Sequence, residues 1–227
     1  MYAKCLKRAI DFILSLLALL VLSPVLLILT VLGAIKMKGN PFFTQPRPGK
    51  DEKIFKLIKF RSMTCQTDKD GNLLPDEVRL TGYGKLLRST SLDELPELLN
   101  ILKGDMAIVG PRPQLVRDMV FMNQTQRRRH SVRPGLTGLA QVSGRNNITW
   151  EQKFEYDLAY IDGGITLWKD IKIILMTVGK VFKREDTVRE GTVSDLDFGD
   201  WLLEKGEVTE SVYTTRQEEA RELLHNR

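Results

Sequence analysis

The sequence contains few of the residues that form disulfides or histidine-based sites, with two cysteines and two histidines among 227 residues. Two cysteines make no disulfide framework, which favours a reducing compartment. Two histidines exclude a histidine-rich metal site. A Ser-His-Asp triad would have to use His130, and no matching nucleophile motif accompanies that residue.

Aromatic residues are also scarce, at 7% of the sequence, and they are rarely interleaved with the scattered basic residues. This pattern argues against a nucleic-acid partner. The formal net charge is +5, from 34 basic and 29 acidic side chains. That excess suits an anionic membrane surface or phosphorylated substrates without proving either. A chain of this length can bury one sizeable core.

Residues 12–35 are an uncharged apolar stretch that is long enough to cross a bilayer. Ser23-Pro24 lies in the middle, where a proline kinks or breaks a helix and leaves halves about 17 Å long. A kinked spanning helix and a re-entrant helix both remain open, and the Ser23 hydroxyl is a candidate partner for backbone groups freed at the kink. Positive charge on both sides favours keeping both ends in the cytoplasm; it comes from Lys4, Lys7, Arg8, Lys36 and Lys38.

The stretch 91–113, SLDELPELLNILKGDMAIVGPRP, carries two adjacent carboxylates, Asp93 and Glu94, at the start of a predicted helix. Pro96 favours Asp93 over Ser91 as the N-cap, because proline is tolerated in a first turn. A carboxylate there would lie where the helix dipole favours negative charge and where a phosphate would bind. One apolar face is predicted for this helix, made of Leu95, Leu98, Leu99, Ile101 and Leu102.

An ordinary capping box of Ser91 and Glu94 is the structural alternative. Arg112 follows later in the stretch, between two rigid prolines. A helix cap alone would not need this guanidinium in addition to the two carboxylates. Residues 132–146 add a glycine-rich stretch with Arg133 and Arg145. Glycine lets a backbone approach a phosphate and arginine binds phosphate through paired hydrogen bonds, although a connecting loop has the same composition.

Three segments in order carry a resemblance to the bacterial sugar transferases: KFRSM at 59–63, the stretch 91–113, and VRPGLTGLAQVSGRN at 132–146. Within that family the chain is similar to the small monotopic phosphoglycosyl transferases of the PglC type. The resemblance implies an α+β monotopic membrane protein with three parts. These are a Pro-kinked re-entrant helix (1–39), a mainly helical cytoplasmic catalytic domain with a small β-hairpin and interfacial amphipathic helices (40–190), and a C-terminal extension (191–227).

The resemblance also implies a mechanism, in which Asp93 attacks the sugar-linked phosphate of a UDP-sugar and UMP leaves. A polyprenyl phosphate, expected to be undecaprenyl phosphate, then takes the phosphosugar from Asp93. Mg²⁺ is the expected cofactor, with Glu94 as its best ligand beside Asp93. The other implied substrate-binding residues are Lys59, Arg61, Arg112, Arg133, Gln141, Arg145 and Asp157. For Asp157 two roles are open, orienting a basic partner or assisting the second half-reaction.

The expected setting is the cytoplasmic face of the bacterial inner membrane, with membrane lipid as a partner. Self-association and association with later glycosyltransferases both remain open. One rival function is a hydrolase that uses the same intermediate with water as acceptor, and another is a non-enzymatic lipid-binding scaffold. The sugar itself is not disclosed by these motifs.

Local patterns predict the remaining elements. Residues 42–45 and 54–60 are expected to pair as a hairpin across a turn at 46–49, and residues 64–76 form a surface loop. Helices are predicted at 85–90, 114–130, 150–161, 166–182 and 215–225. The helix at 166–182 suits a membrane interface or the protein core equally well. The basic end of 114–130, residues 127–130, is expected to complement a helix dipole or face a membrane.

Overall fold

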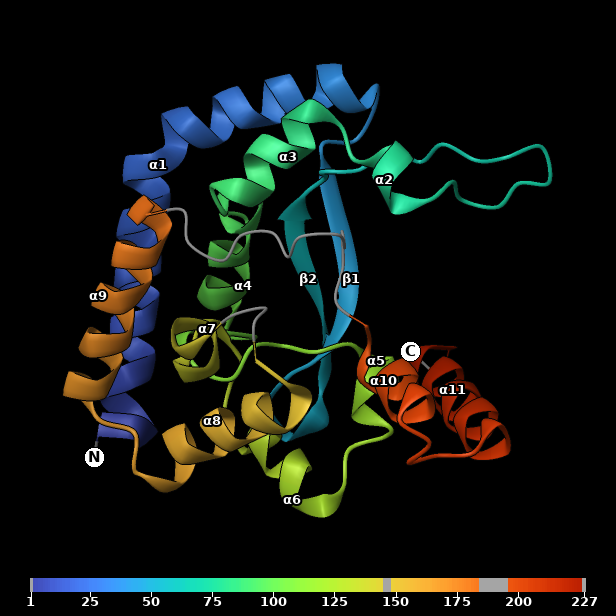
Figure 1. The fold of residues 1–227 in the computed structure, drawn as a ribbon. Helices are drawn as coiled ribbons and strands as arrows, with labels where there is room; N and C mark the ends of the chain where they lie inside the picture. Colours follow the sequence, from blue (N-terminus) through green and yellow to red (C-terminus); the bar gives the residue numbers. More distant parts are fainter. Residues whose placement is uncertain (1, 145–147, 184–195, 226–227) are drawn as a thin grey trace.

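The computed structural model describes residues 2–144, 148–183 and 196–225, and for Lys4, Cys5 and residues 181–183 the backbone alone. Its mixture of helices and strands agrees with the predicted α+β class (Figure 1). In chain order the elements are a π-helical turn (Tyr2–Leu6), α1 (Lys7–Met37), β1 (Phe42–Pro48), a 3-10 turn (Lys50–Glu52), β2 (Ile54–Phe60), α2 (Asp76–Arg79), α3 (Gly82–Ser89), a 3-10 turn (Leu92–Glu94), α4 (Glu97–Lys103), β3 (Ala107–Val109), α5 (Val116–Met119), α6 (Gln124–Arg127), a 3-10 turn (Arg128–Ser131), β4 (Gly135–Thr137), α7 (Leu139–Ser143), α8 (Trp150–Asp162), α9 (Leu167–Lys183), α10 (Phe198–Glu204) and α11 (Glu210–His225).

Helix α1 is long and apolar enough to cross a membrane, and most of its apolar side chains are exposed. Figure 1 shows it rising along one side of the molecule and then turning across the top. The Ser23 hydroxyl donates to the Leu20 carbonyl at 2.8 Å. Pro24 has no N–H to give to that carbonyl, so the hydroxyl takes the place of the missing backbone donor.

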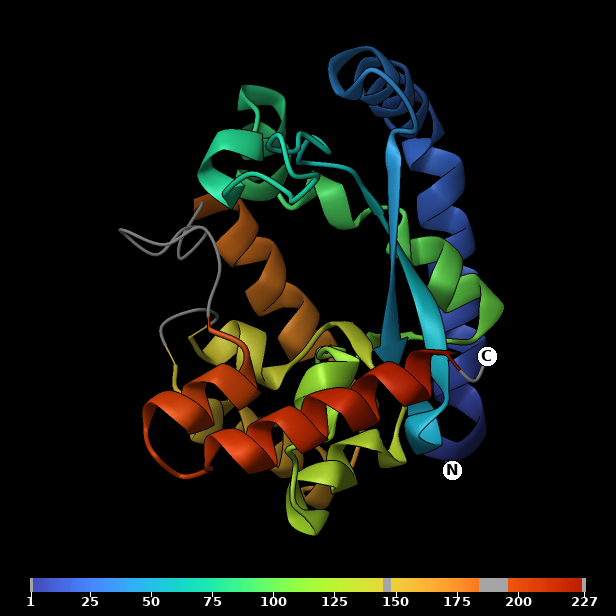
Figure 2. The same cartoon turned by 90° about the vertical axis from the view of Figure 1, so that its right-hand side faces the viewer.

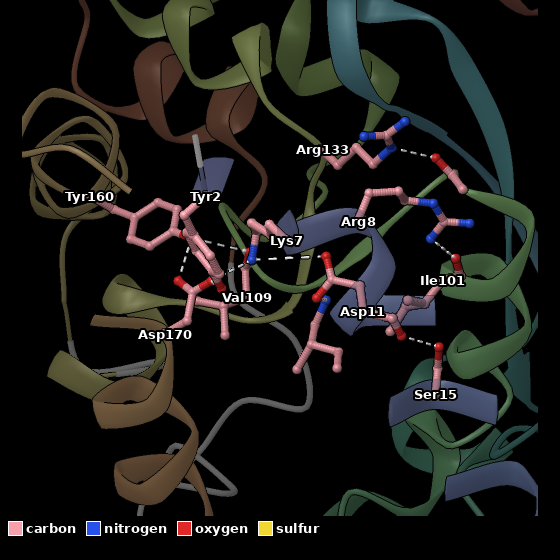
Figure 3. Close-up of polar contacts among 12 residues, drawn as sticks. Tyr2, Lys7, Arg8, Asp11, Ser15, Ile101, Val109, Arg133, Tyr160 and Asp170 are labelled. Carbon is pink, nitrogen blue, oxygen red and sulfur yellow. Dashed lines mark hydrogen bonds and ion pairs between the residues drawn. The ribbon is translucent and has the colours of Figure 1, made fainter. Parts of the chain in front are cut away.

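A buried polar network fastens the first turns of α1 to the rest of the protein (Figure 3). The Lys7 ammonium lies 2.6 Å from Asp170 of α9, and the Tyr2 and Tyr160 hydroxyls each donate to the same carboxylate at 2.7 Å. Asp11 accepts a hydrogen bond from the Ile108 N–H of β3 at 3.2 Å. Buried charges need such partners, so this network fixes how α1 meets α8, α9 and β3.

The β1–β2 hairpin is confirmed, in an antiparallel register that runs from Phe42↔Phe60 to Pro48↔Ile54. The predicted turn at 46–49 is wrong, because residues 46–48 continue strand β1. Prolines are tolerated there because β1 has only one neighbouring strand and the ribbon is all edge. The turn instead occupies residues 49–53, where Asp51 and Glu52 take positive φ angles of 54° and 58°.

A second, parallel pair, β3–β4, was not predicted from the sequence. It uses the glycine-rich stretch, because a Cβ added at Gly135 would overlap the backbone of Gly110. The described part of that stretch therefore lets two segments of the chain approach each other.

The predicted long helix at 114–130 is wrong. The chain forms α5, α6 and a 3-10 turn there, because the Asn123 side chain accepts from the Gln126 N–H at 3.0 Å and starts a new helix. The helices predicted at 85–90, 150–161, 166–182 and 215–225 are confirmed as α3, α8, α9 and α11, each with slightly different ends.

The C-terminal helices α10 and α11 lie against α5 and α8, at the end of the molecule away from the second half of α1 (Figure 2). An aromatic cluster joins α10 to α8. Ala220 of α11 packs on the buried side chains of α5.

Candidate active site

The segment before α4 is a turn rather than the start of the helix. Ser91 has a left-handed φ of 55° and makes no capping bond with its side chain, Leu92–Glu94 form a 3-10 turn, and Pro96 is the N-cap of α4. Asp93 is therefore not the helix N-cap that the sequence predicted. Asp93 instead lies in this 3-10 turn, near the charged side chains of Glu94, Lys59, Arg112 and Arg88.

The predicted apolar face of α4 is only partly buried. Leu98 and Ile101 lie in the core, whereas Leu99 is exposed. The buried face also holds two polar residues, Glu97 and Asn100. This happens because α4 packs on the backbone of β2, which offers hydrogen-bonding groups rather than a fully apolar surface.

Asn100 sets the position of α4 against β2. Its side chain accepts from the Ile58 N–H at 3.0 Å and donates to the Lys56 carbonyl at 2.8 Å. These bonds satisfy a buried amide and pin the strand next to Lys59. Lys59 is thereby carried to the turn that holds the two adjacent carboxylates.

Lys59, Glu94, Glu97 and Arg112 form the centre of the site. One Glu94 oxygen, Oε1, accepts from Lys59 at 2.8 Å and from Arg112 at 2.7 Å. The same ammonium lies 3.1 Å from Glu97. These partners come from β2, the turn before α4, α4 itself and the rigid turn after β3, so the tertiary fold assembles them.

The protonation of this cluster follows from burial and from its charges. Burial disfavours a charged Glu94, but Arg112 and Lys59 outweigh it and hold the pKa of this carboxyl well below its usual range. Burial raises the pKa of Glu97 to about 7, although Lys59 favours the charged form. Glu94 is thus the permanent anion of the cluster, and Glu97 exchanges its proton near neutral pH.

Asp93 is half-buried beside this cluster. Burial raises the pKa of Asp93 most strongly, and the negative charge of Glu94 raises it further. The nearby cations Lys59, Arg112 and Arg88 lower this pKa. Arg88 of α3 is held by a hydrogen bond from its Nε to the Ser62 hydroxyl at 3.0 Å. A carboxylate among several cations can meet a phosphate without the full like-charge repulsion.

Asp157 has a basic partner, Arg129. The side chains of Asp157 and Arg129 are both buried. Two guanidinium nitrogens of Arg129 donate to one oxygen of Asp157, at 2.9 and 2.6 Å. Arg129 also donates to the Arg112 carbonyl at 2.6 Å. The prediction of a membrane-facing patch is wrong for Arg129 and His130, since both side chains are buried.

Three other predicted residues form hydrogen bonds with groups outside this cluster. Arg133 donates to the Gly104 carbonyl at 2.7 Å, at the C-terminal end of α4, where Arg8 also binds carbonyls (Figure 3). Gln141 of α7 donates to the Leu136 carbonyl at 3.1 Å. Arg61 donates to the Phe42 carbonyl at 3.4 Å. Arg145 lies outside the described residues.

Sequence reasoning missed four contributors: Arg88, Glu97, Asn100 and Arg129. Glu97 lies three residues before Asn100 and four before Ile101, which places it on the buried face of the predicted helix and was a usable signal. Nothing in the local pattern distinguishes Arg129 from its basic neighbours.

The donor set bears on the expected metal. Among the described residues, no group of three or more His, Cys, Asp or Glu side chains could hold a metal ion. Asp93 and Glu94 remain as adjacent carboxylates, and both cations on Glu94 use the same oxygen. Mg²⁺ commonly binds one or two carboxylates together with water and phosphate oxygens. The residues therefore fit a Mg²⁺ ion that the substrate helps to hold, and they do not fit an all-protein site.

A long apolar helix combined with carboxylates among several cations suits a membrane-associated enzyme with an anionic substrate. The comparisons specify the class further. The chain belongs to the bacterial sugar transferase family, whose model matches residues 2–184.

Three relatives illustrate the similarity. The chain is 48% identical over 180 residues to an uncharacterized sugar transferase, EpsL, of Bacillus subtilis, covering 79% of this chain and 89% of that protein. It is 44% identical over 186 residues to the UDP-glucose:undecaprenyl-phosphate glucose-1-phosphate transferase of Klebsiella pneumoniae, covering 78% and 40%. It is 42% identical over 187 residues to the galactosyl transferase CpsE of Streptococcus agalactiae, covering 76% and 41%. The chain thus spans most of the first relative and about two fifths of the two longer ones.

Proposed function

We propose that this enzyme transfers a phosphosugar from a UDP-sugar to a polyprenyl phosphate, with undecaprenyl phosphate as the acceptor and UMP as the released product. The observation that carries the proposal is the Asp93-Glu94 pair beside Lys59 and Arg112. The names of the relatives from Klebsiella pneumoniae and from Salmonella typhimurium, an undecaprenyl-phosphate galactose phosphotransferase, supply the substrate class.

Asp93 is the proposed nucleophile. Its carboxylate oxygen forms a bond to the sugar-bearing phosphorus, the bond from that phosphorus to the bridging oxygen breaks, and UMP leaves with that oxygen. A phosphate oxygen of the polyprenyl phosphate then attacks the same phosphorus, and the bond to Asp93 breaks. The product is a polyprenyl diphosphosugar, and the carboxylate is regenerated.

The cations explain how an anionic nucleophile can approach an anionic substrate. Arg112 has a half-exposed side chain, so it can bind a diphosphate oxygen while it keeps its contact with Glu94. Lys59 is more enclosed and holds both glutamates in place. Mg²⁺ bound at Glu94 and Asp93 would neutralise diphosphate charge and stabilise the leaving group.

We propose that α1 is re-entrant and keeps the site at the cytoplasmic surface of the inner membrane. Both of its halves contact the same catalytic part, since Lys7 binds Asp170 and the Leu29 carbonyl accepts from the Tyr83 hydroxyl at 2.9 Å. A straight spanning helix would carry one half across the bilayer. The exposed Trp168 of α9, whose side chain is 79% exposed, is an amphipathic anchor suited to the same interface.

The membrane arrangement is tested with Ala3→Cys and Asn40→Cys in a background without native cysteines. An impermeant maleimide applied to intact cells should label neither residue until the membrane is permeabilised. Labelling of one end in intact cells would refute the re-entrant model. A known periplasmic cysteine in the same cells serves as the positive control.

The reaction is tested by incubating Asp93→Asn and the native enzyme with a panel of UDP-sugars, Mg²⁺ and undecaprenyl phosphate. The native enzyme should release UMP, and the variant should release none. Mass spectrometry after donor alone should find the phosphosugar on Asp93. Near-native turnover by Asp93→Asn would contradict the covalent mechanism. Release of UMP together with free sugar phosphate would indicate a hydrolase.

A further inference from the structure

Helices α10 and α11 lie beyond residues 2–184, the part that matches the family model, yet they pack against the elements that support Arg112. Arg112 lies in a short turn between two prolines, after β3 and before α5. Prolines limit the backbone angles of such a turn but do not orient it relative to Glu94. Its orientation depends on what holds the carbonyl of Arg112 and the start of α5.

The first support comes from Arg129. Its guanidinium donates to the Arg112 carbonyl at 2.6 Å and lies over the ring of Phe154, 5.9 Å from the centroid. Phe154 belongs to α8 and is buried. The Phe154 ring and the Asp157 carboxylate, both on α8, together limit where the Arg129 guanidinium can lie.

The second support comes from Asp118 of α5. One carboxylate oxygen accepts from the Leu115 N–H at 3.0 Å, which closes the first turn of α5 directly after the Arg112 turn. The other oxygen accepts from the Phe198 N–H of α10 at 2.9 Å. This buried carboxylate has both oxygens occupied, one on each side.

Phe198 contacts both supports. Its N–H binds Asp118, and its ring meets Phe154 edge-on with centroids 5.1 Å apart. Other contacts hold α10 in place: Arg117 pairs with Asp197, and the Tyr213 hydroxyl of α11 donates to Asp200 at 2.5 Å. Phe198 belongs to the C-terminal extension, so a residue outside the family match contacts both supports of the Arg112 turn.

We propose that the C-terminal helices α10 and α11 position Arg112 for the diphosphate of the donor, through Phe198 acting on Asp118 and on Phe154. The extension is a brace for the phosphate-binding turn and touches no substrate. This inference rests on the proposed function, because it takes the donor to be a nucleoside diphosphate.

The sharpest test is a matched pair of helical glycine substitutions. A Cβ at Gly199 would lie 2.5 Å from a ring carbon of Phe121, in the segment that follows α5, so Gly199→Ala requires α10 or this ring to shift and disturbs the seat of Phe198. Gly179 of α9 has no atom within 4 Å of its added Cβ, so Gly179→Ala makes the same chemical change in open space. Arg117→Gln is a second variant, which releases α10 by removing its ion pairs and adds no atom to the core.

The probe is UDP, which carries the diphosphate but no sugar to transfer, and binding is measured by calorimetry on the full-length enzyme. We expect Gly199→Ala to weaken UDP binding about tenfold, the effect of losing about 1.4 kcal/mol of a charge-assisted contact. Gly179→Ala should bind like the native enzyme. Arg117→Gln should weaken binding in the same direction as Gly199→Ala.

A double-mutant cycle separates positioning from general damage to the fold. In an Arg112→Gln background, Gly199→Ala should have almost no further effect on UDP binding, because the group that it displaces is already gone. Equal losses in both backgrounds, or native binding by Gly199→Ala, would overturn the brace. A native enzyme that neither binds UDP nor releases UMP would instead refute the proposed function.

Discussion

Glu97 gives the site a pH-dependent effect on stability that can be calculated from the structure. Glu97 is 2% exposed, and burial raises its pKa from 4.5 to about 7. Between those values the folded protein keeps a proton that the unfolded chain has lost. The free energy of unfolding contributed by Glu97 is therefore fully present below pH 4.5 and falls as the pH rises through about 7.

The size of the effect follows from the shift. At 1.36 kcal/mol for each pKa unit, the change from low to high pH is about 3 kcal/mol. Glu97→Gln keeps the shape of the side chain but does not titrate. For a chain of this size, about 3 kcal/mol corresponds to roughly 6 to 12 °C in Tm. The variant should therefore become more stable relative to the native protein as the pH rises.

The assay is thermal unfolding followed by circular dichroism in one detergent, at a series of pH values from about 5 to about 8. Glu155→Gln, which changes an exposed glutamate on α8, is the control and should follow the native curve. If the Tm difference between Glu97→Gln and the native protein is the same at both ends of the series, the assigned burial and proton are wrong.

Two further predictions concern the charge network. Glu94→Gln removes the anion shared by Lys59 and Arg112, so we expect a folded protein whose UMP formation falls about 100-fold and responds differently to Mg²⁺; full activity in excess chelator would argue against the metal. Asp157→Asn leaves the buried Arg129 without its carboxylate, at a cost of about 3–5 kcal/mol. Thermal unfolding should show a large loss of Tm, and a change below about 2 °C would contradict the ion pair.

Several elements were predicted correctly from short stretches of the sequence. The long apolar helix, the β1–β2 pairing and helices α8 and α9 all follow from repeats within one segment, at a period of two or of about 3.6 residues. The adjacency of Asp93 and Glu94 is likewise a property of the chain itself. Such features can be predicted because they depend on neighbouring residues rather than on distant contacts.

Other expectations failed where a local turn or a capping side chain interrupted the helical pattern. The helix predicted from Asp93 begins at Glu97 instead, behind a turn that Ser91 enters with positive φ. The helix predicted at 114–130 is divided where Asn123 caps a new one. In both places the helical periodicity was present, and a local polar interaction or turn competed with it successfully.

The sequence by itself determined the candidate groups for phosphate chemistry, which are neighbouring carboxylates and a guanidinium between prolines. It also determined the apolar helix expected to attach them to a membrane. Only the tertiary structure decided how they meet, because Lys59 and Glu94 are 35 positions apart and Arg129 and Asp157 are 28 apart. Contacts over such separations depend on how α4 packs on β2 and how α8 packs on the 3-10 turn at Arg128–Ser131. Local spacing can place Glu97 on the buried face of a helix, but it does not show which charged partners lie there or how the burial shifts its pKa.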